Sequence, residues 1–405
     1  MKTYPNTFSE NFISTEIRTS RPKTLTTFFL RLGNQYPVLR SEFLKLIDSA
    51  SAVSSPSEYF YDSLRALHQG LPIYLRLIFM ALEKLIPRHV ADVLIRYVIN
   101  NLLTPYFLLR DENAFKKAMM RFQKNDTGII LDVVGEEALF LFEAENFLKS
   151  YEHAMEMFGG KVAVKLSSLM PSSSFRLGNY KENKCELKKK FVHILMLAQK
   201  NRVSVTLDAE EYFKWCLLIE DVFCETLLER EWSNIPDVGI ALQAYRRDSF
   251  ESAERFLAVA KKRGCPITVR VVKGAYWDTE KVIADQSGWK YPLFEKKDET
   301  DQNFDRIISF FLQNRKYIHV SPATHNPKNI AHALKETRGD YVNFEFQVLY
   351  GLGESVRRAL SRNKIPVSVY CPLVRQGGSA TEGLAYLVRR ILENTAGNSC
   401  LLKNL

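Results

Sequence analysis

The chain has 405 residues, of which 46% are hydrophobic and 25% are charged, as is ordinary for a soluble globular protein. No uninterrupted apolar run is long enough to span a bilayer, which argues against an integral membrane protein. The formal net charge of +10 favours anionic partners such as nucleotide cofactors, acidic membrane surfaces or nucleic acid, without choosing among them.

Residues 1–125 are predicted to form an all-helical arm, and no chemical motif is found in them. Within the arm, residues 71–87 are apolar but contain Arg76, Glu83 and Lys84, which predicts an amphipathic helix. Such a helix more often packs against a core than anchors a protein in a membrane, and both interpretations stay open at this point.

Residues 126–405 contain eight short apolar, β-branched runs separated by helical patterns. The predicted strands are residues 129–134, 161–166, 203–207, 238–242, 267–272, 317–320, 341–346 and 365–370. Alternating strands and helices imply a parallel sheet with right-handed crossovers. Eight such units predict an α/β fold, a closed TIM-like (β/α)8 barrel that forms one catalytic domain.

Polar side chains gather where the predicted strands end. They are Asp132, Glu136, Lys165, Asp208, Gln243, Arg270, Lys273, Thr324, His325, Asn326, Gln347 and Tyr370. Active sites of such barrels lie at the carboxyl ends of the strands, so we expect these side chains to face a common site.

The fifth strand and its end carry two cations, Arg270 and Lys273. A buried lone charge is costly unless it is paired, so these cations should face an anionic group. Gly274 allows close approach of the backbone, and Tyr276 and Trp277 offer flat surfaces. The segment therefore suits a flat, anionic cofactor, and a core strand with charged ends is the alternative.

The predicted last helix contains Arg389, Arg390 and Glu393. Two adjacent arginines can hold a carboxylate in bidentate fashion, and a glutamate within one turn can hold either guanidinium in place. An isolated motif of this kind is usually a surface ion pair. Because this helix follows the last strand of the predicted barrel, a carboxylate site beside the mouth is favoured here.

Asp208 and Lys165 end neighbouring predicted strands, so we expect an ion pair between them at the barrel mouth. A lysine in a barrel can instead form a Schiff base, as in aldolases, and Lys165 and Lys273 are the two candidates. This second interpretation does not explain the aromatic pair after Lys273 or the double arginine.

The chain contains no GxGxxG dinucleotide fingerprint and no P-loop. A flavin would therefore have to bind through side chains at the strand ends, where Gln243 and His325 are well placed. The charged excursion at residues 285–301 contains Lys297 and Thr300, which could hold phosphates or could belong to an ordinary surface loop.

The six cysteines show no CxxC spacing, so no zinc or other metal site is expected. No signal peptide is visible, which predicts an intracellular protein with reduced thiols. The positive charge is not gathered on one helix, which argues against nucleic-acid binding.

These motifs resemble the proline dehydrogenase family, especially the FAD-dependent barrel of the bifunctional proline utilisation flavoproteins. The matching segments occur in family order and are residues 132–136, 164–167, 207–211, 243–245, 269–278, 324–326, 344–347, 351–354 and 386–394. They cover about residues 90–400, and the fifth-strand and last-helix motifs are the most specific.

The resemblance implies oxidation of L-proline to 1-pyrroline-5-carboxylate by hydride transfer to flavin N5, with electrons passed to a membrane quinone. FAD would be held by Gln243, Arg270, Lys273, Gly274, Tyr276, Trp277, Lys297, Thr300, His325, Asn326 and Glu393. The proline carboxylate would meet Lys165, Arg389 and Arg390. The ring would lie among Asp208, Tyr276, Leu349 and Tyr370. Glu136 matches the family's gate residue, which pairs with an active-site arginine, here Arg389.

The sequence departs from the family pattern at the loop after Tyr370, which looks longer, and at Glu295, where a small hydroxyl residue is usual. Because the chain stops soon after the last helix, we expect a single activity, with a separate 1-pyrroline-5-carboxylate dehydrogenase using the product. A cytoplasmic protein with transient contact at the inner membrane face is expected. The alternatives are a Schiff-base aldolase and a degenerate barrel that acts as a binding protein.

Overall fold

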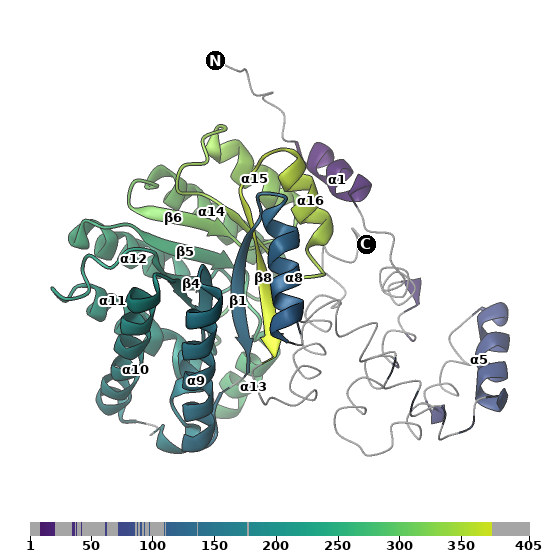
Figure 1. The fold of residues 1–405 in the computed structure, drawn as a ribbon, viewed down its shortest axis with the longest axis horizontal. Coiled ribbons are helices and arrows are strands. Elements are labelled where there is room, and N and C mark those ends of the chain that lie inside the picture. Colours follow the sequence, from purple (N-terminus) through teal and green to yellow (C-terminus); the bar gives the residue numbers. More distant parts are fainter. Residues whose placement is uncertain are drawn as a thin grey trace.

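The structure is a computed structural model that describes residues 9–20, 72–85, 111–135, 137–175 and 178–374. It also describes the single positions 35, 36, 38, 42, 61, 62, 87, 90, 93, 97 and 109. Eight parallel strands form one curved sheet with helices on its outside (Figure 1). The strands are β1 (Gly128–Val134), β2 (Lys161–Val164), β3 (Ser204–Leu207), β4 (Val238–Gln243), β5 (Ile267–Val272), β6 (Ile318–Pro322), β7 (Phe346–Leu349) and β8 (Val367–Val374).

The sheet order is β6-β5-β4-β3-β2-β1-β8-β7. The two outer strands approach each other through two parallel bridges, Val320 with Phe344 and Ala323 with Gln347, so the sheet nearly closes on itself. The predicted (β/α)8 barrel is confirmed.

Each crossover carries a helix on the outside of the sheet. These helices are α9 (Leu141–Phe158), α10 (Tyr180–Asn201), α11 (Leu217–Leu227), α12 (Ser249–Arg263), α14 (Lys297–Gln313), α15 (Pro327–Thr337) and α16 (Glu354–Arg362). A further helix, α13 (Trp277–Ser287), lies between β5 and α14, and α8 (Glu112–Gln123) precedes β1. The predicted excursion at 285–301 is therefore the end of α13, a connecting loop and the start of α14.

Two strands differ from their predicted positions. The seventh was predicted at 341–346, but β7 begins at Phe346, because Asn343 adopts a left-handed conformation (φ 54°) and interrupts the apolar run. The eighth was predicted to end at Tyr370, but β8 continues to Val374 in register with β1. Residues 371–374, which we expected to begin a long loop, therefore belong to the sheet.

Successive side chains along each strand point alternately outward, to the helices, and inward, to the barrel interior. Outward side chains such as Val162, Leu207 and Val269 are fully buried in one apolar core between the sheet and the helices. The inner face is largely polar: Lys161 of β2 contacts Glu345 at the start of β7, although these strands are not neighbours in the sheet. Polar contacts therefore cross the barrel interior.

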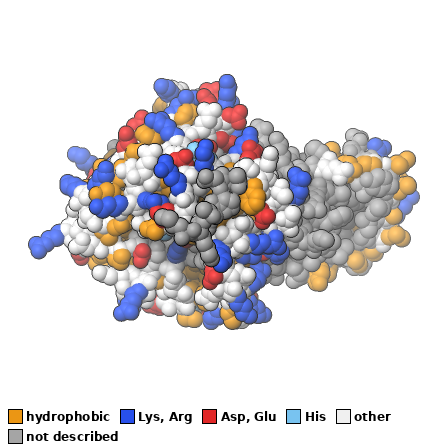
Figure 2. Space-filling view, turned by 90° about the horizontal axis from the view of Figure 1, so that it is seen from above, with side chains coloured by type: hydrophobic (Ala, Val, Ile, Leu, Met, Phe, Trp, Pro, Cys, Tyr) orange, Lys and Arg blue, Asp and Glu red, His pale blue; other side chains and the backbone are white. Residues whose placement is uncertain are grey.

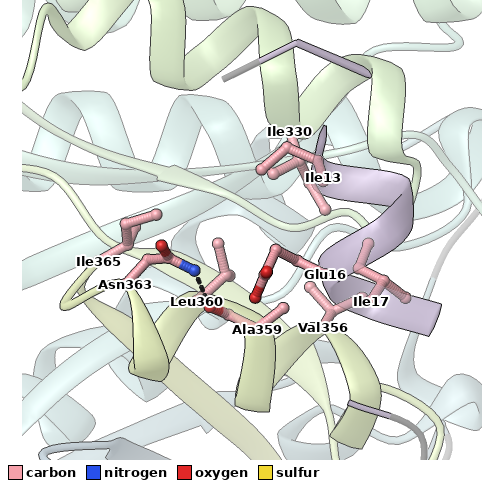
Figure 3. Close-up of a pocket in the computed structure, with 9 residues that line it drawn as sticks. All are labelled: Ile13, Glu16, Ile17, Ile330, Val356, Ala359, Leu360, Asn363 and Ile365. Carbon is pink, nitrogen blue, oxygen red and sulfur yellow. Dashed lines mark hydrogen bonds between the residues drawn. The ribbon is translucent and has the colours of Figure 1, made fainter. Parts of the chain in front are cut away.

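Helix α1 (Glu10–Thr19) packs on the outside of the barrel against α15 and α16. Ile13 and Ile17 face Ile330, Val356 and Leu360 around a small pocket (Figure 3). The helix is anchored at both ends, since the Ser9 side chain accepts from the Phe12 backbone N–H and Arg362 donates to the Ser20 hydroxyl at 3.1 Å.

Helix α5 (Ile73–Leu85) lies within the predicted amphipathic segment, and its side chains Ile73, Leu77 and Leu85 are exposed. No helix in the described ranges is long and apolar enough to cross a membrane. Much of the rest of the predicted arm lies outside the described residues, so the boundary at residue 125 stays a prediction. Lys and Arg side chains are scattered over the face seen in Figure 2.

Candidate active site

Asp208 is the centre of a polar cluster at the carboxyl ends of the strands. Its carboxylate accepts from the Tyr370 hydroxyl at 2.7 Å and from Nη1 of Arg270. Nζ of Lys165 lies 3.5 Å from the same carboxylate and still closer to Asp132. The ion pair expected between Asp208 and Lys165 is therefore present. Asp132, which was expected only as one of the polar strand ends, is a second acid that pairs with Lys165.

Lys165 is held as a cation. Burial alone would lower the pKa of its ammonium group, but the nearby charge of Asp132 outweighs that effect, with further contributions from Tyr370 and Asp208. The pKa of Lys165 is consequently raised well above its ordinary value. Burial, followed by the charges of Asp132 and Asp208, likewise raises the pKa of Tyr370. The cluster thus presents a stable ammonium group and a neutral phenol.

Arg270 is 3% exposed and its guanidinium is held on two sides. Nε donates to Oε1 of Gln347 at 2.6 Å, Nη1 contacts Asp208, and the ring of Tyr370 lies 5.0 Å from the guanidinium carbon. Nη2 is buried and has no hydrogen-bond partner among the described residues. An unsatisfied buried donor of a cation is costly, so this atom is suited to an anionic or strongly accepting ligand.

Gly274 is exposed, and the ring of Tyr245 packs closely against its backbone. Its φ of +134° is rarely adopted by other residues, and a Cβ built there would lie 2.3 Å from the ring of Tyr245. Trp277 follows at the start of α13, with its ring 6.1 Å from that of Tyr245, and Tyr276 is the residue that caps this helix. The indole N–H of Trp277 is a second buried donor without a partner in the described part of the chain.

A second cationic group surrounds Asp301 near the start of α14. Lys273 contacts one oxygen of Asp301, and Lys297 and the Asn326 amide contact the other at 3.0 and 3.3 Å. Thr300, beside Asp301, has a buried hydroxyl with no partner in the described ranges. Two lysines, an amide and a hydroxyl in one place can bind phosphate oxygens.

His325 is a neutral acceptor. Its Nε2 accepts from the backbone N–H of Leu349 at 3.1 Å, which assigns the ring proton to Nδ1. Burial, with the charge of Lys273, lowers the pKa of His325 to about 4. Gly353 makes the contact possible, since a Cβ there would lie 2.7 Å from Nε2. The neutral ring can therefore donate a hydrogen bond from Nδ1 without placing a positive charge in the site.

Gln243 ends β4 and is buried. Its Oε1 lies 3.7 Å from the thiol of Cys216, which burial keeps protonated by raising its pKa. The thiol in turn accepts from the buried Arg246 at 2.8 Å.

The structure brings seven of the predicted site residues into two groups. Lys165, Arg270 and Tyr370 surround the carboxylate of Asp208. Lys273, Lys297 and Asn326 surround the carboxylate of Asp301. Leu349 packs with Tyr370 in the barrel interior. Glu136, Arg389, Arg390 and Glu393 lie outside the described residues.

Two residues that contact these groups had been given no specific role from the sequence. Gln347 and Asp301 hold the cations in place. Gln347 was visible only as a polar strand end, and nothing in the local sequence singles out Asp301.

Comparisons with known proteins point to one family. The family model for proline dehydrogenase matches residues 115–403. The bifunctional protein PutA of Escherichia coli is 29% identical over 288 residues, covering 66% of this chain and 21% of that protein. Proline dehydrogenase 1 of Bacillus subtilis is 26% identical over 300 residues, covering 71% of this chain and 85% of that protein.

Solved structures agree with the sequence matches. Proline utilization A from Bdellovibrio bacteriovorus, inactivated by N-propargylglycine, superposes with a TM-score of 0.79 at 26% identity. That alignment covers 97% of this chain and 42% of the other. The chain thus spans about a fifth of the bifunctional curated relative and less than half of this structural one.

Proposed function

The chain belongs to the proline dehydrogenase family, and from this we propose that it oxidises L-proline to 1-pyrroline-5-carboxylate with FAD as cofactor. The observation that carries the proposal is the buried guanidinium of Arg270 at the barrel mouth. It is fixed on two sides, and its Nη2 has no partner in the part of the chain that the structure describes. Buried polar groups are usually hydrogen-bonded, so a bound ligand is a natural partner for this donor.

The residues at the mouth fit a flavin dinucleotide. Nη2 of Arg270, Nε1 of Trp277 and Oγ1 of Thr300 are buried and have no hydrogen-bond partner among the described residues. Gly274 is exposed and has no side chain, so its backbone leaves room for a flat group to lie close. We infer that FAD is held by Gln243, Arg270, Lys273, Gly274, Tyr276, Trp277, Lys297, Thr300, His325, Asn326 and Glu393.

The cofactor, when bound, would accept a hydride from C5 of proline. The protein's part is to bind and orient the substrate and to exclude water. Lys165 is a permanent cation suited to the proline carboxylate, and we propose that Arg389 and Arg390 complete that site. Asp208, Tyr276, Leu349 and Tyr370 would surround the ring, and Glu136 would close over it by pairing with Arg389.

This arrangement disfavours the Schiff-base alternative. A lysine that attacks a carbonyl must be a neutral amine, whereas the pKa of Lys165 is raised. Borohydride treatment in the presence of aldehyde or ketone substrates should leave both candidate lysines, Lys165 and Lys273, unmodified. A covalent adduct on either lysine would support the aldolase interpretation.

We propose that the electrons pass to a membrane quinone and that a separate 1-pyrroline-5-carboxylate dehydrogenase uses the product. The protein would then be cytoplasmic and would touch the inner membrane face. In support, Leu139, Phe140, Leu141 and Phe142 are each more than half exposed just after the loop that follows β1, on the mouth side. Four adjacent exposed apolar side chains suit an interface with lipid.

Sedimentation with lipid vesicles tests this contact. The double variant Phe140→Ser/Phe142→Ser should stay in the supernatant while the unchanged protein pellets. Met196→Ser removes a half-exposed side chain on α10 and is the control. Equal pelleting of all three would remove this run as the membrane contact.

The function itself is tested by the visible absorbance spectrum before and after anaerobic addition of L-proline. Flavin bands that bleach with proline are expected. Flavin bands that do not bleach would mean that the protein binds a flavin but does not oxidise L-proline. If the protein takes up no FAD, the interpretation as a degenerate, non-enzymatic barrel would be favoured.

A further inference from the structure

A chain of side-chain contacts runs through the barrel interior from its amino-terminal end to its mouth. It begins at Lys161, the first residue of β2, and passes through Glu345, Gln347 and Arg270 to Asp208. Lys161, Gln347 and Arg270 belong to β2, β7 and β5. Glu345 directly precedes β7, and Asp208 directly follows β3. Three of the four contacts therefore link strands, or the residues next to them, that are not neighbours in the sheet. They are therefore contacts across the interior.

The first contact anchors Glu345. Nζ of Lys161 donates to both oxygens of this carboxylate, at 2.6 and 2.5 Å, and the Ser368 hydroxyl donates to Oε2 at 2.7 Å. Burial would raise the pKa of Glu345, but the charge of Lys161 and these hydrogen bonds outweigh it and lower the pKa. Glu345 is thus a fixed, ionised acceptor.

The ionised acceptor orients the next residue. Nε2 of Gln347 donates to Oε1 of Glu345 at 3.3 Å, so the carbonyl end of the amide must point the other way. That end accepts from Nε of Arg270 at 2.6 Å. A reversed amide would set its NH2 group against the guanidinium and its oxygen against the carboxylate, and both contacts would be repulsive.

Arg270 is then held along two edges. Gln347 occupies Nε, Asp208 occupies Nη1, and Nη2 remains without a partner among the described residues. With the two other edges held, the plane of the guanidinium and the direction of the unpartnered donor are set.

We propose that Glu345 and Gln347 are positioning residues which, through Arg270, orient the donor that the cofactor meets. The inference rests on the proposed function. It adds that the orientation of Arg270 is set by contacts that begin at the opposite end of the barrel. Gln347 contacts Arg270 directly, and Glu345 acts on Arg270 through Gln347.

The test compares FAD affinity among variants of the full chain, measured by quenching of flavin fluorescence on titrating the FAD-free protein. Gln347→Met keeps the size of the side chain and removes both amide contacts. We expect the dissociation constant for FAD to rise about tenfold, as for loss of one hydrogen bond to a charged group. Glu345→Gln should weaken binding in the same direction by a smaller factor.

Two further variants separate positioning from packing. Ser321→Ala is the matched control: Ser321 is in register with Arg270, is fully buried, and has a hydroxyl without a partner in the described part of the barrel. It should bind FAD within about twofold of the unchanged protein, because no contact to Arg270 is lost. The exchange Glu345→Gln/Gln347→Glu conserves net charge and can restore the contacts, so it should bind more tightly than Gln347→Met.

The outcomes are distinguishable. If the unchanged protein binds FAD and is reduced by proline, but Gln347→Met binds FAD as well as Ser321→Ala, the positioning role is wrong and the proposed function stands. If the unchanged protein binds no FAD, both the positioning role and the proposed function are wrong. If Gln347→Met does not fold, Glu345→Gln and the double exchange decide: equal affinity of both with the unchanged protein overturns the inference.

Discussion

The hydroxyl of Tyr370 donates to Oδ2 of Asp208 at 2.7 Å, although the two residues are 162 positions apart in the chain. One comes from β8 and the other follows β3, strands on different sides of the barrel. Asp208 also neutralises two buried cations, Lys165 and Arg270. A single carboxylate therefore organises the mouth, and its removal should have several effects at once.

Asp208→Asn should lower both stability and activity. Removing one partner of a buried ion pair leaves an uncompensated charge, so the free energy of unfolding should fall by about 3 kcal/mol. Misplacement of Lys165 and Arg270 should lower kcat/KM for proline on the order of a hundredfold. Thermal unfolding and steady-state kinetics measure the two effects.

The control for this change is Asp221→Asn, which breaks an ion pair with Arg255 (2.6 Å) outside the barrel. It should change kcat/KM by less than about twofold, because surface pairs contribute little and this one is remote from the mouth. If Asp208→Asn behaved like Asp221→Asn, Asp208 would have no organising role.

Gly274→Ala should weaken FAD binding. The new Cβ would lie 2.3 Å from the Tyr245 ring, so the aromatic side chain or the backbone must move. We expect a rise of at least about tenfold in the dissociation constant for FAD, since the backbone of Gly274 belongs to the proposed cofactor site and Trp277 of that site packs near Tyr245. Gly264→Ala is matched to it, because its φ is also positive (+68°) but its Cβ would meet nothing within 4 Å. Similar FAD affinity for both variants would contradict a cofactor site at Gly274.

The neutral state of His325 predicts acid sensitivity. Its pKa is lowered from 6.5 to about 4 in the folded protein. Between these values the unfolded chain binds a proton that the folded protein does not, so stability is lost as the pH falls from about 6.5 to about 4. The difference corresponds to a loss of about 3 kcal/mol at most.

His325→Gln keeps an acceptor for the Leu349 N–H but cannot titrate. Its free energy of unfolding, from denaturant titrations at several pH values, should fall less steeply below pH 6.5 than that of the unchanged protein. His153→Gln, at a partly exposed contact with Glu112, should leave the slope as it is. Parallel curves for all three proteins would exclude His325 as the source.

The buried carboxyl group of Glu210 should make stability depend on pH in the opposite direction. Burial raises the pKa of its carboxyl from 4.5 to about 7, and the hydrogen bonds from Ser167 only partly oppose this. Here the folded protein holds a proton that the unfolded chain releases, so stability falls as the pH rises from about 4.5 to about 7. The amide in Glu210→Gln carries no charge at any of these pH values.

Glu210→Gln should therefore be more stable than the unchanged protein at pH 8, by up to about 3 kcal/mol, and should lose that advantage near pH 4.5. Glu225→Gln, on the exposed face of α11, is the control and should show no such pH-dependent gain. A constant difference across the pH range would point to packing instead of ionisation.

Local sequence was sufficient for the barrel and for part of its mouth. Alternation of apolar strands with helical patterns is a short-range property, and it identified all eight strands to within a few residues, with the seventh displaced. Polar residues at strand ends indicated the active face, because parallel strands must bring their carboxyl ends together. The pairing of Lys165 with Asp208 followed from the same rule, since consecutive βα units place β2 beside β3.

Contacts across the interior depended on the closed barrel. Arg270 pairs with Gln347, and Lys161 pairs with Glu345. Each pair links parts of the barrel that are far apart in the sequence. The gathering of Lys273, Lys297 and Asn326 around Asp301 depends in the same way on how α14 seats against the strand ends. The sequence by itself determined which strands form and which face carries the chemistry. Only the tertiary structure decided which charges meet, because that is set by barrel closure and shear and not by spacing along the chain.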